Sequence, residues 1–321
     1  MKLRTPYLLP PEKQADLDYL IRLEWWSLGT RLSIVVVLAF VLGSSQAMKA
    51  AWLEDILSLV PPIAFLIAMR FRNRPPDKDF PYGYQRITNI AFLCSAVALT
   101  LMGGYLLVDS LLKLIRMEHP SIGAIELFGE TIWLGWLMIA ALIYSVIPPV
   151  IIGHMQVKAA VKVHEKTVFV DGKMSKADWM TGLAAIIGIL GVGAGFWWAD
   201  ALAGGLIALD VTKDGVKSLK GAIGDLLDRR PRFTSKSEPE GLEEELEAEL
   251  CAMDWVDSAA VRLREEGHMF SGEAFVVPNS DEYLARRLRE ASRALSQHDW
   301  RIYEVVVTAV PDEADARSPA S

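Results

Sequence analysis

Cysteine and histidine are scarce in this chain, which has two cysteines and five histidines among its 321 residues. Cys94 and Cys251 are isolated, so they provide neither a disulfide framework nor a thiolate metal site. His268 and His298 are either ligands in a folded C-terminal domain or, as is commoner, single surface histidines. The sequence also has no nucleophile elbow, phosphate loop or histidine-based metal motif, which argues against an enzyme.

The sequence predicts neither a cleavable signal peptide nor a basic nucleic-acid-binding patch. The first 24 residues mix charges throughout and have no apolar core followed by small residues. Residues 236–321 carry 20 acidic and 9 basic side chains, which leaves the rest of the chain at about +4 against −7 for the whole. This charge distribution separates a membrane part from an acidic soluble tail and gives no indication of nucleic-acid binding.

Long apolar runs are abundant. The chain is 52% hydrophobic with a mean hydropathy of +0.25, and several runs reach the roughly 20 residues that a helix needs to cross a bilayer. The sequence predicts a polytopic α-helical membrane protein with six transmembrane helices at residues 26–47, 51–70, 87–112, 131–153, 178–199 and 201–222.

Basic residues indicate the orientation of these helices. Arginines and lysines gather in the connections 70–86 and 154–177, whereas the alternate connections carry few. Since such residues favour the cytoplasmic side, both termini are predicted to be cytoplasmic.

The C-terminal part predicts a small cytoplasmic α+β domain. Its elements follow the order α-β-β-α-β, which is typical of a ferredoxin-like sandwich with helices on one face of a sheet. The predicted organisation is a cytoplasmic N-terminal segment, a transmembrane domain, a linker, the α+β domain and a disordered tail, at residues 1–25, 26–228, 229–241, 242–311 and 312–321.

Acidic residues and prolines meet in the second predicted helix. Glu54 and Ser58 are four residues apart on one helix face, and Asp55 is rotated by about 100°. Pro61 and Pro62 cannot donate to the carbonyls four residues earlier, and such carbonyls at membrane depth need protein or a water-lined cavity. The pattern predicts a cation site. The alternative is that the carboxylates lie in water at the interface and the prolines only kink the helix.

The fourth predicted helix repeats this pattern. Its SVIPP, ending in Pro148 and Pro149, matches the SLVPP of the second helix. Paired helix breaks indicate transporter sites, so these prolines are further predicted helix-break positions.

The fifth predicted helix supplies a second set of candidate ligands. Met174 and Asp178 are four residues apart, and Asp171 lies one turn earlier. Asp178 is interpreted either as a ligand at membrane depth or as an N-terminal cap, where acidic residues are favourable.

The sequence resembles the cation diffusion facilitator, or cation efflux, family over nearly its whole length. The most specific resemblance lies in RPPDKDFPYGYQR (74–86), KADWMTGLAAIIGI (176–189) and ADALAGGLIALDVTKDGVKSLKGAIGDLLDR (199–229). The resemblance implies a dimeric exporter of divalent metal ions that works by proton-coupled alternating access. It also implies an integral protein of the bacterial inner membrane.

The resemblance places Glu54 and Ser58 at one pair of transport ligands and Met174 and Asp178 at the other. The family's usual aspartates and histidines are thus partly replaced, which argues against tetrahedral zinc. Carboxylate, hydroxyl and carbonyl oxygens suit manganese, iron(II) or magnesium better. Met174 either adds a soft ligand or fills space, and the ion stays unresolved among manganese, iron(II) and zinc.

Two further family features can be placed on this sequence. Asp77, Phe80 and Tyr84 stand at a secondary metal site but are unfit to hold metal. Arg86 and Asp228 match a charge pair that locks the third and sixth helices at the dimer interface.

The resulting hypothesis is divalent cation efflux by proton antiport, with metal ion and protons as substrates and no cofactor. Glu54 and Asp178 would face one another and exchange a proton for the metal. The alternatives are a non-transporting membrane scaffold or regulatory subunit with a degenerate metal site, and an organic-cation transporter.

Overall fold

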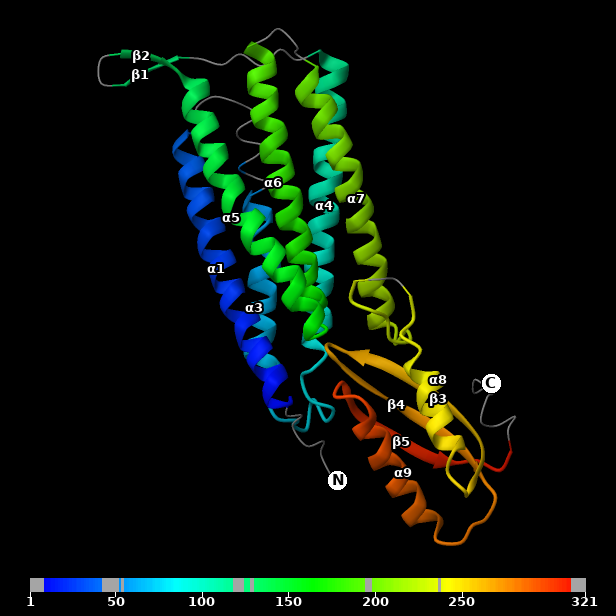
Figure 1. The fold of residues 1–321 in the computed structure, drawn as a ribbon. Helices are drawn as coiled ribbons and strands as arrows, with labels where there is room; N and C mark the ends of the chain where they lie inside the picture. The colour runs from blue at the N-terminus through cyan, green and yellow to red at the C-terminus, as the bar shows by residue number, and fades with distance from the viewer. Residues whose placement is uncertain are drawn as a thin grey trace. The chain divides into compact units, whose positions relative to one another are not determined.

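A computed structural model describes residues 9–41, 52, 55–117, 124–127, 130–193, 198–235 and 238–312. The chain divides into two compact units. One contains residues 15–70 and 90–222; the other contains residues 1–14, 71–89 and 223–321. The first is made of long helices, and the second is built around a small sheet (Figure 1).

The helical elements are α1 (Pro11–Val41), α3 (Val60–Arg72), α4 (Ile87–Arg116), α5 (Leu134–Lys162), α6 (Lys166–Gly193) and α7 (Ala199–Leu226). A short antiparallel hairpin, β1 (Ala124–Leu127) and β2 (Glu130–Trp133), precedes α5. Figure 1 shows α1, α4, α5, α6 and α7 running alongside one another.

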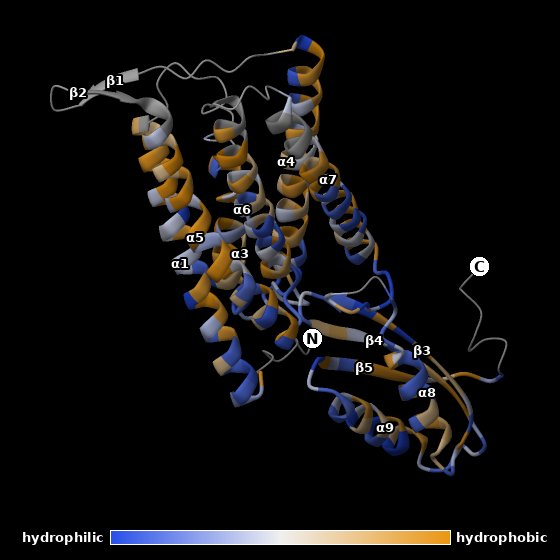
Figure 2. Ribbon diagram, turned by 45° about the horizontal axis from the view of Figure 1, so that its top comes forward, coloured by the Kyte–Doolittle hydropathy of each residue, from blue (hydrophilic) through white to orange (hydrophobic). Residues whose placement is uncertain are grey.

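Among the described residues, three helices are long and apolar enough to cross a bilayer: Pro11–Phe40, Ile87–Arg116 and Trp136–Lys162. Apolar residues predominate along α4 and α5, as the orange colour of these two helices in Figure 2 shows. Ile143, Ile147 and Ile151 form an exposed stripe along α5. An apolar stripe exposed in the isolated protein is suited to lipid contact.

Two predicted connections are helical instead. α1 begins at Pro11 rather than near residue 26, and α6 begins at Lys166 rather than near residue 178. The early part of α1 continues the helix because Leu17, Leu20 and Leu23 recur on one buried face. The basic segment 154–177, predicted as a loop, forms the end of α5 and the start of α6.

Two carboxylates of α7 are paired with lysines of α6. Lys173 Nζ lies 3.1 Å from Asp214 Oδ1, and Lys176 Nζ lies 3.5 Å from Asp210 Oδ2. These pairs between helices explain how charged residues are accommodated along α6 and α7.

The C-terminal elements are α8 (Leu242–Cys251), β3 (Val256–Glu266), β4 (Met269–Pro278), α9 (Leu284–His298) and β5 (Ile302–Ala309). This is the predicted α-β-β-α-β order. The sheet order is β3-β4-β5, antiparallel between β3 and β4 and parallel between β4 and β5. The parallel pair needs a crossover connection, which α9 provides.

The core of this sheet unit lies under its two helices. Leu246 and Leu250 of α8 and Leu295 of α9 are fully buried in one cluster with Phe270 and Val305 of the strands. Burial of such side chains contributes about 1.5–3 kcal/mol each. Helices α8 and α9 therefore cover the same face of the sheet.

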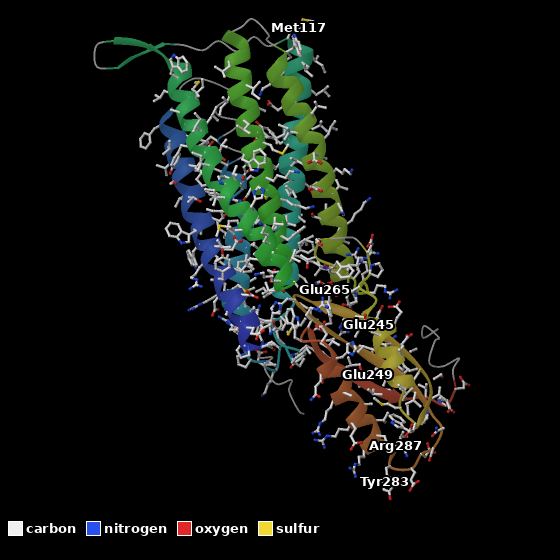
Figure 3. All side chains as sticks on the ribbon, in the orientation of Figure 1. Met117, Glu245, Glu249, Glu265, Tyr283 and Arg287 are labelled. Atoms are coloured by element: carbon white, nitrogen blue, oxygen red, sulfur yellow. The ribbon has the colours of Figure 1, made fainter. Side chains whose placement is uncertain are left out.

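Within the sheet unit, Asn89 in the first turn of α4 is hydrogen-bonded to the β3–β4 turn. Asn89 Nδ2 donates to the Glu265 carbonyl over 3.2 Å, and the Gly267 amide donates to Asn89 Oδ1 over 2.7 Å. Gly267 has φ +75°, which favours glycine. Glu265 is labelled in Figure 3.

Candidate cation site

One face of α1 carries Glu24, Ser27 and Arg31, which fall on the same side of a helix because they are three and four residues apart. All three are buried, whereas Trp26 and Phe40 of the same helix are exposed. A charged residue buried in an apolar helix of a membrane protein indicates a functional site.

A matching polar face lies on α6. Asp171, Ser175 and Asp178 recur at helical spacing, and Asp171 and Ser175 are fully buried. The side chain of Asp178 is 6% exposed. Because α6 begins at Lys166, Asp178 lies well inside the helix and does not cap its N-terminus. The capping interpretation of Asp178 is therefore wrong.

Helices α5 and α6 approach each other closely at two glycines. A Cβ on Gly172 would lie 2.6 Å from Val157 Cγ2, and a Cβ on Gly153 would lie 2.6 Å from Ser175 Cβ. Small residues allow this approach between membrane helices. The close packing brings Gln156 of α5 beside the polar face of α6.

Gln156 bridges two carboxylates. Its Nε2 donates to Asp171 Oδ2 and, over 2.9 Å, to Glu24 Oε1. Its Oε1 accepts from Ser175 Oγ at 3.3 Å. The amide thus holds acidic groups of α1 and α6 together in a buried network.

The guanidinium of Arg31 lies at the centre of this network. Arg31 Nη1 lies 2.6 Å from Asp171 Oδ1, and Nη2 lies 3.9 Å from Asp178 Oδ2. Nη2 also donates to Ser175 Oγ over 2.6 Å. The side chains of Arg31 and Asp171 are 4% and 1% exposed, so this ion pair is shielded from solvent.

The helix interruption contributes a backbone oxygen. Residues 55–57 are helical, Ser58 and Leu59 form a turn, and α3 begins at Val60. Pro62 has no N–H with which to bond the Ser58 carbonyl. That carbonyl instead accepts a hydrogen bond from Arg31 Nη1.

The two pairs of prolines differ in their effect. Pro61 and Pro62 occupy the first turn of α3, where missing amides cost little. Pro148 and Pro149 lie inside α5, which continues from Leu134 to Lys162. The prediction that these two prolines break the helix is therefore wrong, because α5 is continuous through them. A proline can bend a helix without ending it.

Two carboxylate oxygens of the network have neither a hydrogen bond nor an ion pair in the described part of the chain. They are Glu24 Oε2 and Asp178 Oδ1, and both are buried. Asp55 lies near enough to Asp178 and Arg31 to interact with them electrostatically. Four carboxyl groups thus surround one guanidinium.

The remaining predicted ligands have different positions. Glu54 lies outside the described residues. The hydroxyl of Ser58 donates to the Asp55 carbonyl over 2.8 Å. Met174 is fully buried in an apolar cluster with residues such as Phe92 and Leu99, which fits the space-filling role considered for it.

No group of three or more histidine, cysteine, aspartate or glutamate side chains is arranged to hold a metal ion within the described ranges. The predicted ligand set is therefore not assembled as a metal cage in this structure. Of its described members, Asp171 and Asp178 instead form ion pairs with Arg31.

The loop before α4 holds the proposed secondary positions. Asp77 Oδ2 accepts from Tyr84 Oη at 2.6 Å, and Oδ1 accepts from the Phe80 amide at 2.8 Å. The Tyr84 hydrogen bond lowers the pKa of Asp77. Asp77 therefore serves to fold this loop.

Arg86 forms an ion pair with Asp228, and both side chains are about half exposed. The predicted role of this pair in locking two helices at a dimer interface stays a prediction.

The sequence interpretation did not identify Glu24, Arg31 and Gln156. The first predicted helix began too late to include Glu24. Arg31 and Glu24 are seven residues apart, a spacing that could have revealed a polar stripe once α1 was extended.

These features define an integral membrane protein with a buried cluster of cationic and acidic groups between helices. A model of the cation efflux transmembrane domain matches residues 28–227, more than half of the chain. The protein therefore belongs to the cation efflux family, as its resemblance predicted. Since this is a family of transporters, the protein is not an enzyme.

Relatives support the same conclusion. Manganese efflux system protein MneP of Bacillus subtilis is 26% identical over 71% of this chain and 73% of its own length. Manganese efflux system protein MneS of the same organism is 22% identical over 57% and 59%. A probable cation efflux system protein of Mycobacterium tuberculosis is 21% identical over 89% and 82%.

Proposed function

We propose that this protein exports a divalent metal ion, with Mn²⁺ as the first candidate, through a site that includes Asp55, Asp178 and the Ser58 carbonyl. The observation that carries this proposal is the excess of buried carboxyl groups over cationic groups beside a helix interruption. Membership in the cation efflux family supports the direction of transport.

The chemistry of the donors favours a hard cation. The described groups that contact Arg31 together with Asp178 are the Asp171 carboxylate, the Ser175 hydroxyl and the Ser58 carbonyl. These oxygens suit Mn²⁺, Fe²⁺ or Mg²⁺ better than Zn²⁺, which favours histidine and cysteine. The names of MneP and MneS point to manganese. Glu54, next to Asp55 in the sequence, belongs to the proposed set.

Proton exchange follows from the charge balance of the proposed site. Four carboxyl groups and one guanidinium cannot all stay ionised in a dry interior without a further positive charge. A departing metal ion would therefore be replaced by protons. Antiport with alternating access satisfies this requirement.

The proposed topology has six spans, formed by α1, the interrupted segment ending in α3, and α4 to α7. An even number of spans places both termini on one side, and the basic segment 70–86 places that side in the cytoplasm. The proposed location is the bacterial inner membrane, and the proposed assembly is a homodimer.

The test uses protein reconstituted in phosphatidylethanolamine–phosphatidylglycerol vesicles that contain a Mn²⁺-quenched dye. With an imposed pH difference, wild type is expected to transport Mn²⁺. Asp178→Asn and Asp55→Asn are each expected to lower the rate of Mn²⁺ transport at least about tenfold, because a lost charged contact costs about 1.5–3 kcal/mol. Asp210→Asn removes an exposed carboxylate of α7 and should keep wild-type flux. Equal flux in all four proteins would reject the proposed site.

A second candidate function is a non-transporting membrane scaffold or regulatory subunit. The ion pairs of Arg31 with Asp171 and Asp178 favour it, because they could replace a lost metal with a fixed cation. Titration of the purified protein with Mn²⁺, Fe²⁺, Zn²⁺ and Cd²⁺ distinguishes the two functions. No saturable binding to any of them would favour the scaffold.

A further inference from the structure

The groups that accept hydrogen bonds from the Arg31 guanidinium or form ion pairs with it include four oxygen ligands. They are the carboxylates of Asp171 and Asp178, the hydroxyl of Ser175 and the carbonyl of Ser58. A divalent ion such as Mn²⁺ takes the same kinds of ligand. The guanidinium thus lies among the groups that the proposed function assigns to the metal.

We propose that Arg31 is a tethered cation that competes with the metal ion for the transport site. This inference rests on the proposed function and adds a regulatory and selectivity residue to it. Metal binding at Asp178 then requires the guanidinium to withdraw, and the guanidinium returns when the metal leaves.

The arrangement of the nitrogens supports an exchange. A strong arginine–carboxylate pair is commonly bidentate, with both nitrogens on one carboxylate. Here Nη1 lies 2.6 Å from Asp171, whereas Nη2 reaches Asp178 only at 3.9 Å. The contact with Asp178 is the longer of the two, and it is the contact that an entering metal ion would replace.

A carboxylate oxygen without a partner is a second, independent observation in favour of the competition. Asp178 Oδ1 is buried and has no hydrogen-bond partner in the described part of the chain. A buried carboxylate oxygen without a partner costs free energy, which an additional cation would recover. Arg31 therefore does not satisfy the site fully.

Mn²⁺ binding to purified full-length protein measures the competition. Apparent affinity falls in proportion to the fraction of time that a site is free to bind. If the guanidinium occupies the site for nine-tenths of the time or more, Arg31→Gln should lower the Mn²⁺ dissociation constant at least about tenfold. Arg22→Gln, which removes an exposed arginine of the same helix, should leave it unchanged.

A double variant guards against misfolding. Arg31→Gln alone leaves Asp171 without its partner, whereas Arg31→Gln with Asp171→Asn replaces the pair with neutral groups of similar shape. This protein should fold and also bind Mn²⁺ more tightly than wild type through Asp178.

Free guanidinium tests the competition in another way. In Arg31→Ala, millimolar guanidinium added to the buffer should weaken Mn²⁺ binding, and in wild type it should not.

The outcomes separate this inference from the proposed function. Mn²⁺ binding in wild type with unchanged or weaker binding in Arg31→Gln and in the double variant would overturn the inference and leave the transporter intact. Binding only after removal of Arg31 would support the inference and favour the scaffold function for wild type. Absence of binding in all of these proteins would overturn both.

Discussion

Arg31 Nη1 lies 2.6 Å from Asp171 Oδ1, and the two side chains are almost completely buried between α1 and α6. This ion pair joins helices that are 140 positions apart in the sequence. The pair lies in a hydrogen-bond network in which Gln156 Nε2 also donates to Glu24 Oε1. The helical unit therefore contains a buried charged interaction at the proposed cation site.

Removal of one partner of this pair should destabilise the helical unit strongly. Asp171→Asn leaves a buried guanidinium with reduced compensation, a change that costs about 3–5 kcal/mol in comparable sites. Thermal unfolding in detergent should show a large fall in Tm for Asp171→Asn and a smaller fall for the double variant with Arg31→Gln. Equal falls for both proteins would contradict a direct interaction between these residues.

The α5–α6 contact should tolerate no added methyl group at Gly172. Its Cβ would lie 2.6 Å from Val157 Cγ2 and 3.1 Å from the Gly153 carbonyl oxygen. Gly172→Ala should therefore lower Tm, since overpacking typically costs about 1–3 kcal/mol. Gly104→Ala in α4, where the added atom meets nothing within 4 Å, is the matched control and should keep or raise Tm. A similar Tm for both variants would mean that the helices can separate freely.

His298 makes the stability of the sheet unit depend on pH. Its Nδ1 lies 2.8 Å from Glu249 and its Nε2 lies 3.2 Å from Glu245, two residues of α8 labelled in Figure 3. The Glu245 and Glu249 hydrogen bonds raise the pKa of His298 above its ordinary value, with burial acting against them.

A raised pKa in the folded state stabilises the protonated form. The contribution is complete below about pH 6.5, the ordinary histidine pKa, and is lost as pH rises through the folded-state pKa. Because His298 is 30% exposed, we expect less than about 1 kcal/mol. Full-length wild type should exceed His298→Gln in Tm more at pH 6 than at pH 8.5. A constant difference would show that His298 does not act through its charge.

Gly267 should be irreplaceable in the β3–β4 turn for two reasons. Its φ is +75°, and an added Cβ would lie 2.1 Å from Thr88 Oγ1. Gly241 shares a positive φ of +78° but has only a 4.0 Å neighbour, so Gly241→Ala isolates the backbone strain, which costs about 1 kcal/mol. Gly267→Ala should lower Tm more than Gly241→Ala. A larger fall in Tm for Gly241→Ala than for Gly267→Ala would mean that the close contact with Thr88 does not restrict position 267.

The order of elements was predictable where the pattern was local. Apolar runs indicated α4 and α7 within a few residues, and alternating residues indicated the strands of the C-terminal unit in their correct order. The starts of α1 and α6 were not predictable from the sequence, because the charged residues there are equally typical of a loop. In each helix one of these charged residues, Glu24 in α1 and Asp171 in α6, is buried against other helices, which depends on packing and not on local sequence.

The site was only partly predictable for the same reason. Asp178 and Ser58 of the proposed site are predictable because a helix pattern and a proline pattern mark them. Arg31 and Gln156 became part of the site through tertiary contacts with α6, such as the close approach at Gly172. A single arginine in an apolar helix does not reveal its partners.

The central claim is that Asp178 helps to hold a divalent metal ion. Electron paramagnetic resonance of free Mn²⁺ during titration of the purified protein tests it most directly. Wild type, Asp210→Asn and Met174→Leu should all remove Mn²⁺ from solution saturably, Met174 because it packs among apolar side chains. Asp178→Asn should not. Saturable binding of equal strength in Asp178→Asn would contradict the account.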